Sequence, residues 1–164
     1  MHHYISNLTH YNLWANAKLT GFLKELEPAL LDKKITSSFN TIRKTLYHVW
    51  DAEAIWYNRI NGSSFSDWPS KNFTGTNEDA FNGFIEQSGM FARFAENANE
   101  DILMRQIKYK SLEGKEYDNN ISDIIVHTMN HSTFHRGQII TMLRNAGFTE
   151  LSSTDYITYL RQQK

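Results

Sequence analysis

The chain has 164 residues, of which 40% are hydrophobic and 21% charged, as expected of a globular protein with one sizeable core. Its 17 basic and 18 acidic residues give a formal net charge of -1, and no basic stripe indicates nucleic-acid binding. We find no apolar run near roughly 18 residues and no secretory signal pattern, so we expect no membrane span and a cytoplasmic location. The absence of cysteine excludes disulfides, cysteine nucleophiles and thiolate metal sites.

Apolar side chains recur at helical spacing in the first third of the chain. They predict a first helix over about 5–26, which Pro28 stops because proline disfavours helical backbone before it. A second helix is predicted over about 41–60. Asn40 is its expected N-terminal cap, and the Asn-Gly pair at 61–62 is its expected end.

A segment rich in serine, glycine and aromatic residues follows at 63–76 and is predicted to be a long loop. Thr76 and Asp79 then have the spacing of a capping box, which predicts a third helix over about 77–98. Around Glu113 and Gly114 the period changes to an alternation of apolar and polar residues. This alternation predicts a short exposed hairpin.

A fourth helix is predicted over about 121–145 and ends at Gly147. A last short helix over about 154–162 is expected to have Ser152, Ser153 or Thr154 as its cap. Four helices of about 30 Å with broad apolar faces must pack on one another. The sequence therefore predicts an all-α four-helix bundle in a single domain, 1–164. The first and third links between its long helices are long, so one or both are expected to cross the bundle.

Three histidines recur every four residues in the fourth predicted helix, at His127, His131 and His135. Residues four apart on a helix lie on one face, so neighbouring imidazoles in this series can reach a single cation. His131 and His135 also lie on an apolar stripe that faces the core. Two interpretations remain open, because a buried imidazole needs a partner for its ring nitrogens and either a metal or a polar protein group supplies one.

His48, on the second predicted helix, is the candidate for a third ligand. Metal sites in bundles form from inward side chains on facing helices, and three histidines with an open position match the ligand count of catalytic zinc sites. The alternative is a partly exposed helix histidine without a ligand role. Without cysteine, any transition-metal site in this chain must use histidine, carboxylate, carbonyl or water.

Four sequence pieces resemble the DinB/YfiT-like family of metal-binding four-helix bundles, in the expected order over nearly the whole chain. They are Tyr-Asn-Leu-Trp-Ala-Asn at 11–16, Leu-Tyr-His-Val-Trp-Asp-Ala-Glu at 46–53, Asn-His-Ser-Thr-Phe-His-Arg-Gly-Gln-Ile at 130–139 and Thr-Asp-Tyr-Ile-Thr-Tyr-Leu at 154–160. The resemblance implies that His48, His131 and His135 are the metal ligands. Family members often carry a further histidine where this chain has Phe134.

Three other residues are candidates for supporting roles. His127 is expected to line the pocket or support a ligand, with a surface histidine as the alternative. Glu53 falls on the apolar side of its helix and is expected to orient an imidazole, or else to lie on a solvated face. Asp51, which is also near His48, is considered for the same role, and a solvated face is favoured for it. His10 is expected near the pocket mouth, with the same alternative. No catalytic residue is identified.

Three neutral histidines suit zinc or nickel, and iron or copper also fit. The resemblance implies an enzyme that transfers a low-molecular-weight thiol, such as bacillithiol or mycothiol, to an electrophile. Hydrolysis by a metal-bound water and a non-catalytic metal-binding role in the stress response are the alternatives. An open pocket above the metal would favour an enzyme. A homodimer is also expected, because a four-helix core of this size leaves aromatic side chains exposed.

Overall fold

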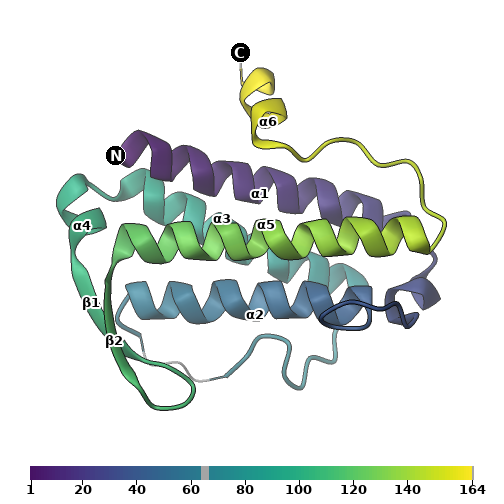
Figure 1. The fold of residues 1–164 in the computed structure, drawn as a ribbon, viewed down its shortest axis with the longest axis horizontal. Helices are drawn as coiled ribbons and strands as arrows, with labels where there is room; N and C mark the ends of the chain where they lie inside the picture. The colour runs from purple at the N-terminus through teal and green to yellow at the C-terminus, as the bar shows by residue number, and fades with distance from the viewer. Residues whose placement is uncertain (64–66, 164) are drawn as a thin grey trace.

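The computed structural model describes residues 1–63 and 67–163, and within them the chain forms the predicted four-helix bundle (Figure 1). The long helices are α1 His2–Lys24, α2 Ile42–Ile60, α3 Asn77–Asn97 and α5 Ile121–Asn145. Shorter elements are the 3-10 helix η1 Pro28–Asp32, the helices α4 Glu100–Met104 and α6 Tyr156–Gln162, and the hairpin strands β1 Gln106–Lys110 and β2 Glu116–Asn120. Among the described residues no helix is both long and apolar enough to span a bilayer.

The order of the helices around the bundle differs from their order in the chain. α1 packs mainly on α3 and α5, and α2 packs on α5 and α3, so that α1 lies diagonally opposite α2. The α1–α2 link and the α3–α5 link, which were predicted to be long, each cross one end of the bundle. Because α2 and α3 run in the same direction in Figure 1, the connection between them returns along the length of the molecule. This α2–α3 connection is the lengthwise crossover.

Hydrogen bonds at the helix ends confirm one predicted cap and correct two others. Thr41, and not Asn40, caps α2, since its side chain accepts a bond of 3.1 Å from the Lys44 amide. α6 begins at Tyr156 and has Asp155 at its cap position, without a side-chain bond to the helix. Ser153 bonds to Asp155 instead. The predicted capping box that opens α3 is confirmed.

The predicted hairpin is confirmed, and a short helix that precedes it was not predicted. Asn99 caps α4 by accepting a bond from the Ile102 amide, and the helix buries Leu103. β1 and β2 are antiparallel, with Tyr109 opposite Tyr117. Gly114 supplies the left-handed backbone of the turn, at φ 83°. The hairpin packs against α2 and α5 and so lies beside the histidine-bearing faces.

Two apolar clusters fill the two ends of the bundle, and a layer of polar side chains separates them. One cluster includes Leu46, Phe84 and Ile139, and the other includes Ile60, Phe91 and Ile125. The layer between them contains a group that we call the central polar network, and all of its side chains are buried. Its members are Asn12, Asn16, Glu53, Ser88, Ser132 and Arg136.

Candidate metal centre

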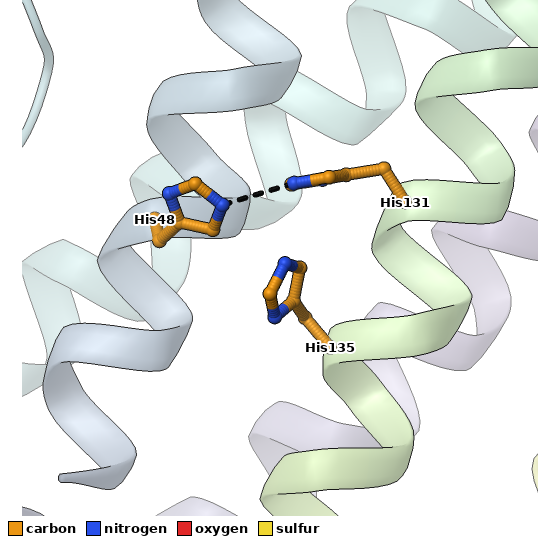
Figure 2. A group of neighbouring side chains, drawn as sticks. All are labelled: His48, His131 and His135. Carbon is orange, nitrogen blue, oxygen red and sulfur yellow. Dashed lines mark hydrogen bonds between the residues drawn. The ribbon is translucent and has the colours of Figure 1, made fainter. Parts of the chain in front are cut away.

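His48, His131 and His135 converge between α2 and α5 (Figure 2). One ring nitrogen from each lies within 4.8 Å of the others. The Nε2 atoms of His48 and His131 are 2.9 Å apart. The helical spacing places His131 and His135 one turn apart on α5, and the packing of α2 on α5 brings His48 opposite them.

Contacts around the cluster fix the orientation of two rings. Phe39 stacks on His48, with ring centroids 4.1 Å apart and an angle of 28° between the planes. The Nδ1 atom of His135 lies 2.8 Å from the amide oxygen of Gln138. Because an amide oxygen only accepts hydrogen bonds, Nδ1 of His135 is the protonated nitrogen and its Nε2 keeps a lone pair. Gln138 is held in turn by a bond from its amide nitrogen to the Ser38 hydroxyl.

The rings of His48 and His131 are neutral at neutral pH. Burial, together with a smaller contribution from nearby His135, lowers the pKa of each to about 4. The short Nε2–Nε2 contact needs a donor and an acceptor, so one of the two rings carries its proton there. A cation that accepts a lone pair from both rings would replace this bond. The buried Nδ1 of His131 has no hydrogen-bond partner within 1–63 and 67–163.

These observations fit a divalent transition metal. Neutral imidazole nitrogens are ligands of zinc, nickel, copper and iron, and three of them leave a position for a further ligand. The protonated Nδ1 of His135 on Gln138 resembles the outer hydrogen bond that metal-bound histidines usually make. The donor set and its local support therefore suit a metal ion better than a purely structural cluster.

A cavity of about 630 Å³ adjoins the cluster, and both His48 and His131 line it. Its walls come from α2, α5 and the hairpin, together with Trp68 from the α2–α3 connection. Aromatic side chains dominate the wall beyond the histidines: Trp56, Trp68, Tyr109 and Tyr117. Two of the three candidate ligands thus face a space large enough for a small organic molecule.

Asp51 also lines this cavity, whereas the sequence favoured a solvated helix face for it. It lies three residues after His48, which puts both on one face of α2. Its carboxylate accepts bonds from the amide and the hydroxyl of Ser70, at 2.9 and 2.6 Å. Burial raises its pKa, although the bonds from Ser70 oppose this change. The spacing from His48 was the one signal that pointed to it.

His127 lines the cavity, as one of its two sequence interpretations proposed. Its ring centroid is 5.2 Å from that of Trp56 and 6.3 Å from that of His131. His10, by contrast, lies on α1, which does not border the cavity. Its Nδ1 bonds to the Ser6 carbonyl oxygen and its Nε2 is 4.0 Å from Glu96 of α3. The expectation that His10 lies at the pocket mouth is therefore wrong.

Glu53 does not orient an imidazole either. It is fully buried, and within the described chain its carboxylate accepts bonds from Asn12, Asn16, Ser88 and Ser132. The helical phase explains the difference, because Glu53 lies five residues from His48 and points to the bundle axis instead of the α2–α5 groove. It belongs to the central polar network.

The fold and the site define a four-helix bundle with three histidines beside an aromatic cavity. A sequence model of the DinB family matches residues 1–164, and the chain belongs to that family. Over 162 residues it is 28% identical to Protein DinB of Bacillus subtilis strain 168, covering 96% of this chain and 94% of that protein.

Solved structures show the same fold. YfiT from Bacillus subtilis, described as a probable metal-dependent hydrolase with an unusual four-helix bundle topology, superposes with a TM-score of 0.71 at 14% identity, over 88% of this chain and 89% of that one. The DinB-like protein YjoA of Bacillus subtilis gives a TM-score of 0.65 at 16% identity, over 90% and 97%. A DinB-like protein of Bacillus cereus ATCC 10987 gives 0.64 at 16%, over 85% and 90%.

Proposed function

We propose that this protein is a metal-dependent enzyme that acts on a small molecule in the cavity. In this proposal His48, His131 and His135 hold a divalent cation, with zinc or nickel favoured over iron or copper. The observation that carries the proposal is that two rings of the cluster form part of the cavity wall. A ligand in the cavity would meet the open side of the metal site.

Each neighbouring side chain has a role in this proposal. Gln138 keeps the proton of His135 on Nδ1, so that Nε2 is free to bind a cation. Phe39 covers one face of His48 and keeps water from it. Asp51 lies one helical turn from His48, where its carboxylate can hold a proton of the substrate or of a water. A bound divalent ion supplies positive charge that lowers the pKa of a water or thiol ligand.

The preferred form of the proposal is transfer of an external low-molecular-weight thiol to an electrophile. The chain has no cysteine, so a sulfur nucleophile must come from outside, and the cavity has room for a thiol next to a second reactant. Hydrolysis is the second candidate. Asp51 favours it, because a half-buried carboxylate with a raised pKa beside a metal site is suited to act as a general base. The description of YfiT as a probable metal-dependent hydrolase also supports it.

The test begins with elemental analysis of untagged protein and reconstitution with the metal found. Thiol transfer is then assayed with bacillithiol, glutathione and cysteine against 1-chloro-2,4-dinitrobenzene, and hydrolysis with p-nitrophenyl acetate. Thiol transfer predicts a rate that needs both metal and thiol and that survives Asp51→Asn. Hydrolysis predicts a thiol-independent rate that Asp51→Asn lowers by about 100-fold or more.

His48→Ala is the control for both assays, since it removes a candidate ligand. If the metallated protein is no faster than this control with any thiol or ester, the enzyme proposal fails. The non-catalytic alternative, a metal-binding protein of the stress response, then becomes the better explanation of the site.

Association into a homodimer remains a proposal as well. Phe134 and Val126 of α5 and Ile157 of α6 are large apolar side chains that stay exposed. A second copy that covers them would remove this apolar surface from water. Light scattering at high concentration should then give twice the chain mass of 19.2 kDa. A particle of the single-chain mass would contradict the dimer.

A further inference from the structure

The cavity extends well beyond the histidine cluster along one face of α2. His48, Ala52, Ile55 and Arg59 recur every three to four residues and all line it. From His48 to Arg59 the helix rises roughly 16 Å, at about 1.5 Å per residue. The cavity therefore has two chemically different ends, with imidazoles at one and a guanidinium at the other.

Aromatic rings hold the Arg59 guanidinium in place. Its central carbon lies 4.4 Å from the ring centroid of Trp56 and 4.8 Å from that of Tyr109. Its Nη2 donates a bond of 2.8 Å to the carbonyl oxygen of Lys110. Stacking on two rings restricts the motion of the side chain, so less freedom remains to be lost when it binds a ligand.

No carboxylate of the described residues lies within ion-pair distance of Arg59. Arg43 and Arg93, by comparison, pair with Asp32 and Glu86. A guanidinium is always charged and has five N–H donors. Only one protein acceptor for these donors, the Lys110 carbonyl, is found in 1–63 and 67–163.

The wall between the two ends is aromatic and largely apolar. Trp56 contacts Tyr109 and His127 edge to face, each with ring centroids 5.2 Å apart. His127 continues this row of rings toward His131. A flat apolar body would therefore find aromatic contact along the whole distance from Arg59 to the histidines.

We propose that Arg59 binds the anionic group of a small organic acid, whose apolar body lies against Trp56 and Tyr109. Carboxylate, phosphate and sulfonate share the planar or tetrahedral oxygen pairs that a guanidinium recognises. In this orientation the opposite end of the ligand points toward His48 and His131. The inference deepens the proposed function, on which it rests, by assigning the substrate to the class of amphipathic acids.

The Asp51 carboxylate in the cavity wall agrees with this direction. Asp51 lies eight residues before Arg59 on α2, roughly 12 Å away along the axis, and is bonded to Ser70. An acid that binds with its anion at the Arg59 end keeps its negative charge far from Asp51. The reverse orientation would bring the two negative charges together.

A matched pair of fluorescent probes tests the anion site. 8-Anilino-1-naphthalenesulfonate and N-phenyl-1-naphthylamine have the same ring system, and only the first carries a sulfonate. Both are titrated into the metal-free full-length protein, into Arg59→Gln and into Arg59→Lys. Arg93→Gln is the control, because it removes a guanidinium from α3 that is not part of the cavity wall.

We expect Arg59→Gln to weaken binding of the sulfonate by about tenfold or more, and to leave the neutral probe unchanged. Arg59→Lys should give an intermediate loss, since it keeps the charge without the planar fork. Equal affinity of wild type and Arg59→Gln for the sulfonate would overturn the proposal. So would an equal loss for both probes, which would mean that Arg59 only supports the wall, and so would a wild-type protein that binds neither probe.

Metal content is measured separately on wild type and Arg59→Gln, and near-ultraviolet circular dichroism checks that both are folded. Sulfonate selectivity in a protein that takes up no metal would leave the anion site standing while the proposed function fails. Normal metal content without sulfonate selectivity would leave the proposed function standing while the anion site fails.

Discussion

The central polar network and the histidine cluster are both polar groups inside one bundle, yet they differ in how their hydrogen bonds are satisfied. The Glu53 carboxylate accepts four bonds from three other helices. Arg136 donates to Asn12 and Asn16, which bridge it to Glu53. The three histidines share one internal bond, and the buried Nδ1 of His131 has no partner in the described chain.

The difference separates structure from function in this fold. A buried charge is tolerated where hydrogen bonds and an opposite charge satisfy it, and the central polar network meets that condition within the protein. Burial still raises the pKa of Glu53 and lowers that of Arg136, because desolvation opposes both charges. In the histidine cluster the hydrogen bonds among the described residues do not satisfy every buried ring nitrogen. The cluster also opens onto a cavity, as expected of groups that bind something from solution.

The largest effect is expected in the central polar network. Glu53→Ala leaves the donors of Asn12, Asn16, Ser88 and Ser132 without their acceptor and the Arg136 charge without its counterion. The free energy of unfolding should fall by about 3–5 kcal/mol, the usual cost of removing one partner of a buried ionic group. Urea unfolding measures this. Glu113→Ala at the exposed hairpin turn is the control and should stay within about 0.5 kcal/mol of wild type. A loss below about 1 kcal/mol for Glu53→Ala would contradict the role assigned to the network.

A change in the histidine cluster should act on metal binding. His131→Ala removes one of the three proposed ligands, and the affinity for zinc or nickel should fall on the order of 100-fold, as expected when one ligand of a small set is lost. Elemental analysis after dialysis measures the change, with His10→Ala on α1 as the matched control. Metal that remains bound at one ion per chain after all three ligands are replaced by alanine would disprove the assignment.

A smaller loss is expected at Gln138. Gln138→Ala removes the acceptor that holds the proton of His135 on Nδ1, so metal affinity should drop by about tenfold, at the low end for an outer partner of a ligand. Competition with a chromogenic chelator measures the affinity. Gln162→Ala, which removes a bond to Trp14 on another face, should have no effect. Equal affinities for Gln138→Ala and wild type would show that the Gln138 bond does not prepare the site.

An effect of a different kind is expected in acid. The ordinary pKa of His48 and His131 is 6.5, and burial lowers it to about 4 in the folded protein. The unfolded chain thus binds more protons between these values, so metal-free protein should lose stability as the pH falls from about 6.5 to about 4. Urea unfolding across this range checks the slope. The double variant His48→Gln and His131→Gln should show a flatter dependence, and an unchanged slope would contradict the lowered pKa values.

Much of the helical structure could be predicted from the sequence, because periodicity and end signals are local. The bounds of α5 and the capping box at Thr76 agree with their predictions. The histidine cluster was also accessible, since His131 and His135 are one turn apart and a family resemblance pointed to His48. The diagonal placement of α1 and α2 was not, because periodicity shows that a helix has an apolar face but not which helix covers it.

The cavity and its residues were harder to predict for the same reason. Asp51 and Arg59 are charged residues on a helix, and a charged helical residue is usually solvated. The hairpin, α5 and Trp68 of the α2–α3 connection face this stretch of α2 and make it a cavity wall. Glu53 was placed wrongly because its partners come from three other helices, and no local pattern shows such a convergence.

The hairpin carries a consequence for how this protein tolerates sequence change. Its strands are largely exposed, yet Tyr109, Leu112 and Tyr117 form one side of the cavity. Substitutions at exposed positions cost little stability, whereas those in the bundle interior cost a great deal. Variation in the hairpin can therefore reshape which molecules fit beside the histidines while the helices that hold those histidines stay the same. The fold thus separates the residues that are free to diversify from those that must be kept.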